Sequence, residues 1–554
     1  MSDDVKVSTF AKTDSISQAK RLAQYVSRLK KEGYVYTTID TSFRKSDTLC
    51  HFIYTGKKFK FNPVIDDSIS RQLVDWLGIN LKSSYDMRQK EELEKKMLQK
   101  FSKNGYPFAK IEFDSLTTRG DTIAYILTLN SFDFIIFDTL KVYPDNVISK
   151  KFLYRYLDIE PSSPYNHEKV LNSKKNLQNL AYLKLKRDPS VSFINKKAIV
   201  NLAFEKVKAN RFDFIIGLLP NTENGVRKWL VTGDVTAEFQ NLLNVGEYSY
   251  FNFKRLKPEN QELSVKFSMP YIFDLPVGPD VDFKLLKNSD TNLDLTSRIG
   301  FRYHLKGLNQ LSVYWDVFNS SLINIDSTSI LASKKLPSNL DVNYNGGGAK
   351  IDLYAIDYLY NPKQGWTINI NSSIGSRIIL ENYQISSLKN EFINFESAYD
   401  TIPKNNLQFT SSIDGSYYLK SGTVGTVRLG LYGIYKFSNS NFLLNELYRY
   451  GGNRNLKGFD EEAFRVDRAI LLDIEYRFIL NKDSYLSLPF FQYSKFRSLA
   501  DNIFSTHQAM SIGLGISFST PAGLFNVSFA AGKLDDSAFD FNNAKIHFGY
   551  LNRF

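Results

Sequence analysis

The chain has 554 residues, of which 43% are hydrophobic and 23% are charged, and its formal net charge is +12. These values fit a folded chain of more than one domain and exclude an intrinsically disordered one. Lysine and arginine are spread along the sequence without a dense basic tract, so the charge indicates solvated faces and no nucleic-acid partner.

Up to about residue 210, helical and strand patterns alternate. Apolar residues recur at helical spacing over 16–32, and two strand-like stretches, VYTTIDTSF and TLCHFIYTG, follow. The same order returns in QKEELEKKMLQKFSKNGYPFAKIEF and DTIAYILTLN, and Gly33 and Gly105 stand at the helix end in each copy. A third copy, with the order strand, helix, helix, strand, strand, begins at FIIFDTLKVYP. The pattern predicts three α+β repeats in tandem.

From Arg211 onward, period-two alternation replaces the helical pattern. The aromatic share of 14%, with 43 Phe and 33 Tyr, favours sheet and is typical of the aromatic belts of membrane proteins. We predict 16 strands, at 211–218, 229–240, 246–256, 261–270, 280–287, 293–303, 308–318, 349–360, 366–376, 408–418, 423–436, 467–479, 484–494, 507–519, 523–533 and 544–554.

The connections between these strands differ in length by side. Short turns such as HLKG, LKSG and LNKD alternate with stretches that include 319–348, 377–407 and 437–466. Short turns on one side and long loops on the other indicate an antiparallel transmembrane β-barrel, and a soluble two-sided sheet is the alternative. Within 467–479 the alternation places Asp473 and Glu475 toward a polar lumen. The residues that it places outward are Ile470, Leu472, Ile474, Tyr476 and Phe478.

Residues that could carry catalysis or bind a metal are not clustered. Cys50 is the single cysteine, the five histidines are scattered, and no HExxH, P-loop or G-x-S-x-G motif is present. We therefore expect no enzyme activity, no catalytic residues, no metal site and no cofactor.

Tandem α+β repeats before a barrel of this size resemble the BamA/TamA family of outer-membrane assembly proteins. The barrel opening RFDFIIGLLPNTENGVRKWLVTGD is similar to that of Bacteroidota members, and NPKQGW (361–366) is similar to the family's Asn-Pro-x-x-Gly turn. The resemblance implies POTRA repeats at 1–57, 58–133 and 134–210, followed by a 16-stranded barrel at 211–554. It also allows for a first repeat that is short of its opening strand.

The most specific match is NLKGFDEE, which lies between the eleventh and twelfth predicted strands. In the family, this loop folds back into the lumen and carries an Arg-Gly-Phe/Tyr motif whose arginine pairs with acidic residues of the inner wall. The corresponding residues here are Lys457, Gly458 and Phe459. The resemblance implies a latch in which Asp473 and Glu475 are the candidate partners. Lysine keeps the positive charge but lacks the bidentate fork of arginine, so we expect a weaker or rearranged latch.

The two ends of the barrel supply a second match. The sequence ends in KIHFGYLNRF, whose terminal aromatic is similar to the recognition signal of outer-membrane barrels. In the family, the first and last strands meet at a weak seam that opens sideways. The resemblance implies a lateral gate whose strands contain Phe212, Phe214, Gly217, Phe548, Gly549, Tyr550 and Phe554.

The implied function is insertion of client proteins into the outer membrane, with the repeats in the periplasm. MSDDVKVSTF carries no secretory signal, and the resemblance implies that the signal is removed. The implied partners are unfolded outer-membrane client proteins, outer-membrane lipids, and accessory lipoproteins or periplasmic partners bound by the repeats. A two-partner-type polypeptide secretion pore is the alternative, for which 16–32 would be a lumen helix, and a passive porin or receptor is a third.

Overall fold

The structure is a computed structural model. It describes residues 5–10, 15–45, 48–180, 182–207, 210–223, 226–257, 260–273, 275–288, 291–305, 307–359, 361–388, 395–403, 405–453, 455–500, 503–520 and 523–551. Among these residues, no helix combines the length and the apolar character that a membrane span requires.

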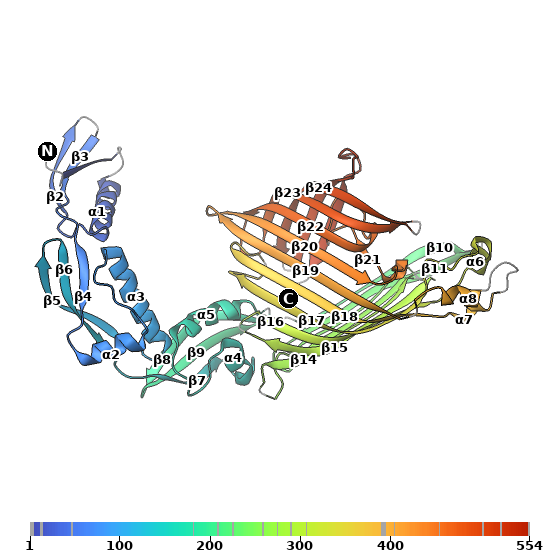
Figure 1. Ribbon diagram of the computed structural model, residues 1–554, viewed down its shortest axis with the longest axis horizontal. Helices are drawn as coiled ribbons and strands as arrows, with labels where there is room; N and C mark the ends of the chain where they lie inside the picture. The colour runs from blue at the N-terminus through green and yellow to red at the C-terminus, as the bar shows by residue number, and fades with distance from the viewer. Residues whose placement is uncertain are drawn as a thin grey trace. The chain divides into compact units, whose positions relative to one another are not determined.

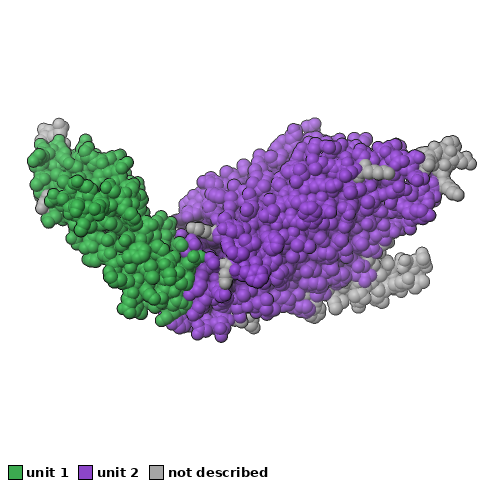
Figure 2. Space-filling view, turned by 60° about the horizontal axis from the view of Figure 1, so that its bottom comes forward, with its two compact units in different colours: residues 1–141, 159–171, 190–201 green, residues 142–158, 172–189, 202–554 purple. Residues whose placement is uncertain are grey.

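The chain divides into two compact units, shown in Figure 2. Unit 1 comprises residues 1–141, 159–171 and 190–201, and unit 2 comprises residues 142–158, 172–189 and 202–554. This division separates parts of the predicted repeat 134–210, so the domain boundaries of the sequence analysis stay a prediction.

Three small sheets with helices occupy the three predicted repeats (Figure 1). Their strand orders are β1-β3-β2, β4-β6-β5 and β7-β9-β8. The first sheet contains an opening strand, β1, so the expectation that the first repeat lacks this strand is wrong. The sequence of β1, VKVSTF, is too short for its alternation alone to predict a strand. The elements are β1 (Val5–Phe10), α1 (Ser15–Lys31), β2 (Thr38–Lys45), β3 (Thr48–Tyr54), β4 (Lys60–Val64), α2 (Ser68–Trp76), α3 (Met87–Lys103), β5 (Lys110–Arg119), β6 (Thr122–Asn130), β7 (Ile136–Tyr143), α4 (Lys150–Leu157), α5 (His167–Gln178), β8 (Leu183–Ile194) and β9 (Lys197–Lys206).

Gly33 and Gly105 end α1 and α3 with backbone φ angles of 105° and 93°. These angles lie in the region that glycine adopts without the steric cost of a Cβ atom. The carbonyl of Gly33 accepts a hydrogen bond from the amide of Phe59 at 2.9 Å, and the carbonyl of Gly105 accepts one from Ile135 at 2.8 Å. Each glycine therefore ends a helix and also holds the chain where the next repeat begins.

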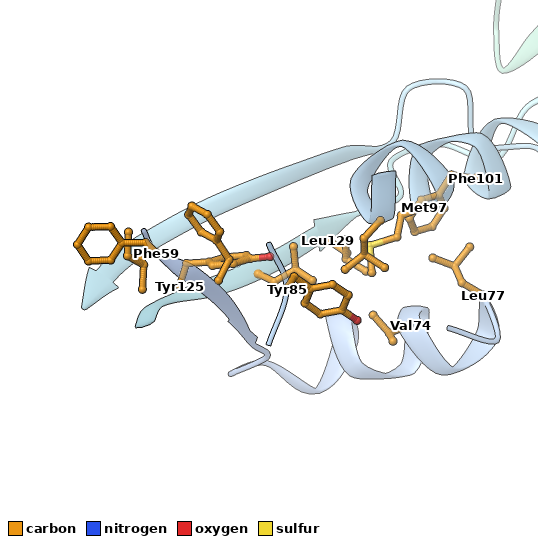
Figure 3. Packing of buried hydrophobic residues seen from close by; sticks show 12 residues of the cluster. Phe59, Val74, Leu77, Tyr85, Met97, Phe101, Tyr125 and Leu129 are labelled. Atoms are coloured by element: carbon orange, nitrogen blue, oxygen red, sulfur yellow. The ribbon is translucent and has the colours of Figure 1, made fainter. Parts of the chain in front are cut away.

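The second repeat has its own apolar core (Figure 3). Met97 and Phe101 of α3 are buried with Tyr125 and Leu129 of β6, and Val74 of α2 belongs to the same cluster. Alternate residues of β6 are buried, as expected for a strand with one face on a core.

In the part of the chain that the structure describes, the large sheet contains sixteen long strands, which are antiparallel and hydrogen-bonded in sequence order (Figure 1). The predicted 16-stranded antiparallel barrel is confirmed. A short strand, β21 (Tyr448–Tyr450), also pairs with β22. The long strands are β10 (Arg211–Glu223), β11 (Val226–Gln240), β12 (Tyr248–Lys257), β13 (Asn260–Ser268), β14 (Val277–Asn288), β15 (Asn292–His304), β16 (Gln310–Leu322), β17 (Asp341–Ile356), β18 (Gly365–Leu380), β19 (Asn405–Ser421), β20 (Gly425–Ser438), β22 (Phe464–Ile479), β23 (Tyr485–Ala500), β24 (Ile503–Thr520), β25 (Gly523–Leu534) and β26 (Lys545–Leu551).

The two faces of this sheet differ in chemistry. On β22, Glu475 and Arg477 are buried on the concave side, whereas the outward side chains are apolar and 37% to 52% exposed. A contiguous exposed apolar surface is stable where lipid covers it. These outward residues are those that the alternation predicts, namely Ile470, Leu472, Ile474, Tyr476 and Phe478.

The long connections pack together beyond one end of the strands. They contain α6 (Ser327–Ser333), α7 (Tyr383–Ser386), α8 (Phe395–Asp400) and the 3-10 helix η1 (Leu444–Glu446). Arg377 of β18 and Glu446 of η1 form a fully buried ion pair, with Nε to Oε1 at 2.6 Å. Asn445 donates to the Ser320 hydroxyl of β16 at 2.8 Å. The segment after β20 therefore reaches across the concave side to β16 and β18.

The third repeat also contacts the barrel within unit 2. The amide of Ser149, next to α4, donates to the carbonyl of Asn244 at 2.7 Å, in the turn between β11 and β12. The side chain of Asn241 in the same turn donates to the carbonyl of Val147 at 3.0 Å. This turn therefore connects α4 to an early hairpin of the barrel.

Candidate functional site: the inner loop of the barrel

The connection that carries the Lys-Gly-Phe motif folds back on itself. We call residues 451–463 the inner loop, of which residue 454 lies outside the described part. Gly451, Gly452 and Gly458 have φ angles of 110°, 95° and 81°, which only glycine adopts readily. The Asn455 side chain accepts hydrogen bonds from the amides of Gly451 and Leu456, each at 2.8 Å. The glycines and this asparagine therefore explain why the loop is compact.

Apolar side chains beneath the loop anchor it on the concave side of the barrel. Leu456 of the loop and Tyr450 just before it are fully buried in a cluster with Phe496 of β23. Phe459 packs edge-to-face on Phe464, with 5.7 Å between ring centroids, and Phe464 packs on Phe496 at 4.7 Å. Burial of this many aromatic groups stabilises the loop in a folded-back position.

The loop lies beside the inner face of β20, β22 and β23, which we call the wall. Gln492 of β23 holds the loop backbone there. The side-chain oxygen of Gln492 accepts a hydrogen bond from the Lys457 amide at 2.9 Å, and its nitrogen donates to the Asn455 carbonyl at 3.1 Å. Gln492 is buried, so the loss of either bond would leave a polar atom without water. No motif in the sequence indicates this role of Gln492, although a short turn joins β22 to β23 and places Gln492 opposite Asp473.

Lys457 does not form the direct ion pair that the sequence analysis expects. Its ammonium nitrogen lies 4.5 Å from the centroid of the Phe490 ring, a cation–π arrangement. Within the described residues, no ion pair within 4 Å joins Lys457 to Asp473 or Glu475. Lys457 and both carboxylates nevertheless line one cavity of about 330 Å³.

Two arginines of the wall occupy the carboxylates instead. Arg428 of β20 lies 2.6 Å from Asp473 and 3.6 Å from Glu475, and Arg477 lies 2.8 Å from Glu475. The register explains this pairing, because β20 places Arg428 directly opposite Glu475. One oxygen of Asp473, Oδ1, is buried without a hydrogen-bond partner in the described part of the chain. The carboxylates that line the cavity are therefore paired with Arg428 and Arg477, and these ion pairs form without Lys457.

The other side of the loop lies on the last two strands. The Gly458 amide donates to Nε2 of His547 on β26 at 2.9 Å. A Cβ atom on Gly458 would lie 2.8 Å from the Gly532 nitrogen and 2.9 Å from the Ala531 carbonyl carbon of β25. Asp460 forms an exposed ion pair with Lys545 of β26 at 2.7 Å. The motif glycine thus allows a backbone approach that any side chain would prevent.

The predicted gate strands lie at the two ends of the sheet. In the described residues, β10 pairs with β11 over its full length of 13 residues, and β26 pairs with β25 over seven. Phe212 and Phe548 are exposed, and a Cβ atom on Gly549 would lie 2.9 Å from the side-chain nitrogen of Asn453 in the inner loop. The side chains of Phe214 and Tyr550, and the whole of Phe554, lie outside the described part, and Gly217 pairs with Thr232 of β11.

The structure thus brings most of the predicted motif residues into one region. Lys457 lines one cavity with Asp473 and Glu475. Phe459 packs on Phe464 and close to Gly532 of β25, and Gly458 lies against β25 and β26. The sequence pattern gave no indication that Gln492 and His547 hydrogen-bond the loop, or that Arg428 pairs with Asp473 and Glu475. It placed Arg477 toward the lumen but did not identify its pairing with Glu475.

Comparisons with known proteins bear on the fold. No protein-family model matches the sequence, and no curated protein matches it. CdiB from Escherichia coli is similar over 96% of this chain and 96% of its own, with a TM-score of 0.51 and 10% identity. The chain has the fold of this CdiB.

Two further solved structures align over most of the chain with TM-scores below 0.5. CdiB from Acinetobacter baumannii covers 98% of this chain and 99% of its own, with a TM-score of 0.49 and 10% identity. BamA from Haemophilus ducreyi lacking POTRA domains 1-3 covers 89% of this chain and 98% of its own, with a TM-score of 0.46 and 13% identity.

Proposed function

We propose that this protein inserts client proteins into the outer membrane through a lateral gate between β10 and β26. The observation that carries the proposal is the contact of the inner loop with β26, made by the Gly458 amide and His547 at 2.9 Å. In this proposal the inner loop keeps the last strand in place, and release of β26 opens the edge of the sheet.

An open sheet edge can guide a client strand. Exposed amides and carbonyls at the edge pair with an extended segment of another chain and give it register.

The repeats receive clients and accessory partners in this proposal. Each small sheet has two edge strands, and in the second repeat these are β4 and β5. Edge strands accept unfolded client segments or periplasmic lipoproteins by strand addition. The fold shared with CdiB and the exposed apolar face of the barrel support placement in an outer membrane, with the repeats in the periplasm. On this basis we also propose that the chain is a Bacteroidota-type member of the BamA/TamA family.

Two observations disfavour the alternatives. α1, which a secretion pore would place in the lumen, belongs to unit 1 and buries Leu29. The inner loop and the segment that carries Glu446 lie on the concave side, which is unfavourable for a passive porin.

Reconstitution tests the proposal. The full chain is placed in vesicles, an unfolded and unrelated outer-membrane barrel is added, and its folding is followed by resistance to heat denaturation on a gel. We expect faster folding than in empty vesicles. Protease-protected client inside the vesicles would instead indicate secretion. Equal folding rates with and without the chain would overturn the proposal.

A further inference from the structure

The outward face of the barrel carries a groove that the proposed gate does not use. It has a volume of about 510 Å³ and lies across β19, β20, β22 and β23. Its floor is apolar and includes Ile413, Leu431 and Ile470. The floor is hollow at Gly433, where a Cβ atom would lie 2.9 Å from Cγ2 of Ile413. The missing side chain therefore forms the depression.

Three cations border this groove at one end. Arg468 of β22 stands opposite Arg497 of β23, and Lys495 stands opposite Ile470 in the next outward row. All three line the groove. The strand register places them on the same outward face as the apolar floor.

A buried carboxylate fixes the two guanidinium groups. Asp467 lies in a bulge of β22, is fully buried, and accepts hydrogen bonds from Nε of Arg468 at 3.3 Å and Nε of Arg497 at 3.0 Å. The Arg468 guanidinium also lies 5.4 Å from the Tyr435 ring centroid. Preorganised guanidinium groups lose little side-chain entropy when they bind an anion.

The groove border is positively charged overall. Three cations face one carboxylate, so a net charge of two remains. Lys495 is exposed, and within the described residues no acidic group lies within 4 Å of its ammonium nitrogen. Phosphate binds guanidinium and ammonium groups with charge-assisted hydrogen bonds, and basic side chains at a membrane surface attract anionic headgroups.

We propose that this groove binds a phosphorylated membrane lipid. Its acyl chain lies over Gly433 and Ile470, and its phosphate contacts Arg468, Lys495 and Arg497. The proposal rests on the membrane placement proposed above, but it does not require the lateral gate. An apolar floor beside a fixed basic border matches the two ends of such a lipid and matches neither a free phosphate nor a neutral lipid.

Lipid binding to the full chain in a neutral detergent tests the proposal. Native mass spectrometry measures dissociation constants for phosphatidic acid and for phosphatidylcholine with the same acyl chains, and inorganic phosphate serves as the headgroup alone. We expect phosphatidic acid to bind most tightly. Equal binding of the two lipids, or full-strength binding of inorganic phosphate, would overturn the proposal.

Matched variants locate the site. Lys495→Gln is expected to weaken phosphatidic acid binding about fivefold, whereas Lys533→Gln, on β25 away from the groove, leaves it unchanged. Gly433→Leu fills the floor and is expected to weaken binding further, whereas Gly347→Leu does not, because this glycine of β17 lies opposite the exposed Trp315, away from the groove, and an added Cβ has no neighbour within 4 Å. Equal binding in all four variants would contradict the proposal, as would a co-purifying protein that is lost in Lys495→Gln without any change in lipid binding.

The same variants separate this proposal from the proposed function. Client folding is measured for each of them in vesicles of phosphatidylcholine alone. If no variant folds clients but the lipid affinities differ as expected, the proposed function fails and the lipid site stands. If clients fold and the lipid affinities are equal, the lipid site fails and the proposed function stands.

Discussion

The inner loop contacts two regions of the barrel that hold it in different ways. On the wall of β20, β22 and β23, it is held by a buried apolar cluster and by both hydrogen-bonding ends of Gln492. On the last strands it is held by close backbone packing at Gly458, by one hydrogen bond to His547, by the exposed ion pair of Asp460 with Lys545, and by Glu461, whose carboxylate lies 3.7 Å from Nδ1 of His547. Exposed ion pairs contribute little, whereas buried polar groups are costly to separate. The loop is therefore expected to stay on the wall while β26 is released from it.

The largest expected effect comes from the wall itself. Glu475→Ala leaves Arg477 buried without its carboxylate, which costs about 3–5 kcal/mol in the free energy of unfolding. Glu462→Ala is the control, because Glu462 forms a more exposed pair with Arg449 and its loss costs less than about 1 kcal/mol. The midpoint of urea unfolding of the folded barrel measures both. Similar midpoints for the two variants would show that the buried ion pair of the wall contributes no more to stability than the exposed pair of the loop.

The next effect is at Gly458. Valine there must adopt a φ of 81° and displace the backbone of β25. Gly422→Val is the control, since its φ is 66° but an added Cβ would have no neighbour within 4 Å. The strained φ alone costs about 1–2 kcal/mol, and the displaced backbone adds about 1–3 kcal/mol in Gly458→Val. Equal losses of unfolding free energy would mean that the loop does not rest closely on β25.

A smaller effect is expected at Lys457. Lys457→Ala should slow client folding, and Lys457→Arg should preserve it. The structure identifies the contact as the Phe490 ring, so a double-mutant cycle of Lys457→Met with Phe490→Leu should give a coupling energy of about 0.5–2 kcal/mol. The corresponding cycle with Glu475→Gln should give less. A larger coupling energy with Glu475 than with Phe490 would instead support the direct ion pair between Lys457 and the wall carboxylates that the resemblance implied.

The smallest effect on stability is expected from His547→Ala, at about 1 kcal/mol, because one hydrogen bond is lost. The informative readout is hydrogen exchange, which should accelerate in β26 and not in β22. His507→Ala, on β24 and bound to Asp535, is the matched control. Unchanged exchange in β26 would show that the loop does not hold this strand.

The alternation of the sequence was sufficient to predict the barrel. Because side chains alternate between faces with a period of two, it identified the outward residues of β22 and the inward positions of Asp473 and Glu475. The strand order placed the Lys-Gly-Phe motif between the eleventh and twelfth strands, and the structure has it between β20 and β22.

The partners of the inward residues could not be predicted in the same way. The pairing of Asp473 and Glu475 with Arg428 depends on the register between β20 and β22, whose strands are joined by a long connection. A long loop leaves this register undetermined, whereas a two-residue turn would fix it. The contact between Gly458 and His547 joins residues 89 positions apart, and no local pattern encodes it.

The proposed function requires β10 and β26 to separate when a client is inserted. A reversible cross-link between these two strands tests this requirement most directly. Cysteine pairs are placed with one member in 211–218 and one in 545–551, in a Cys50→Ser background, and the pair that oxidises efficiently is reconstituted in vesicles. Val527→Cys with Phe548→Cys is the control, because these positions pair between β25 and β26 and their cross-link leaves the seam free. We predict that oxidation of the seam pair lowers client folding to the rate in empty vesicles, that reductant restores it, and that the control pair folds clients in both states. Client folding at the same rate in the oxidised and reduced seam pair would contradict the account.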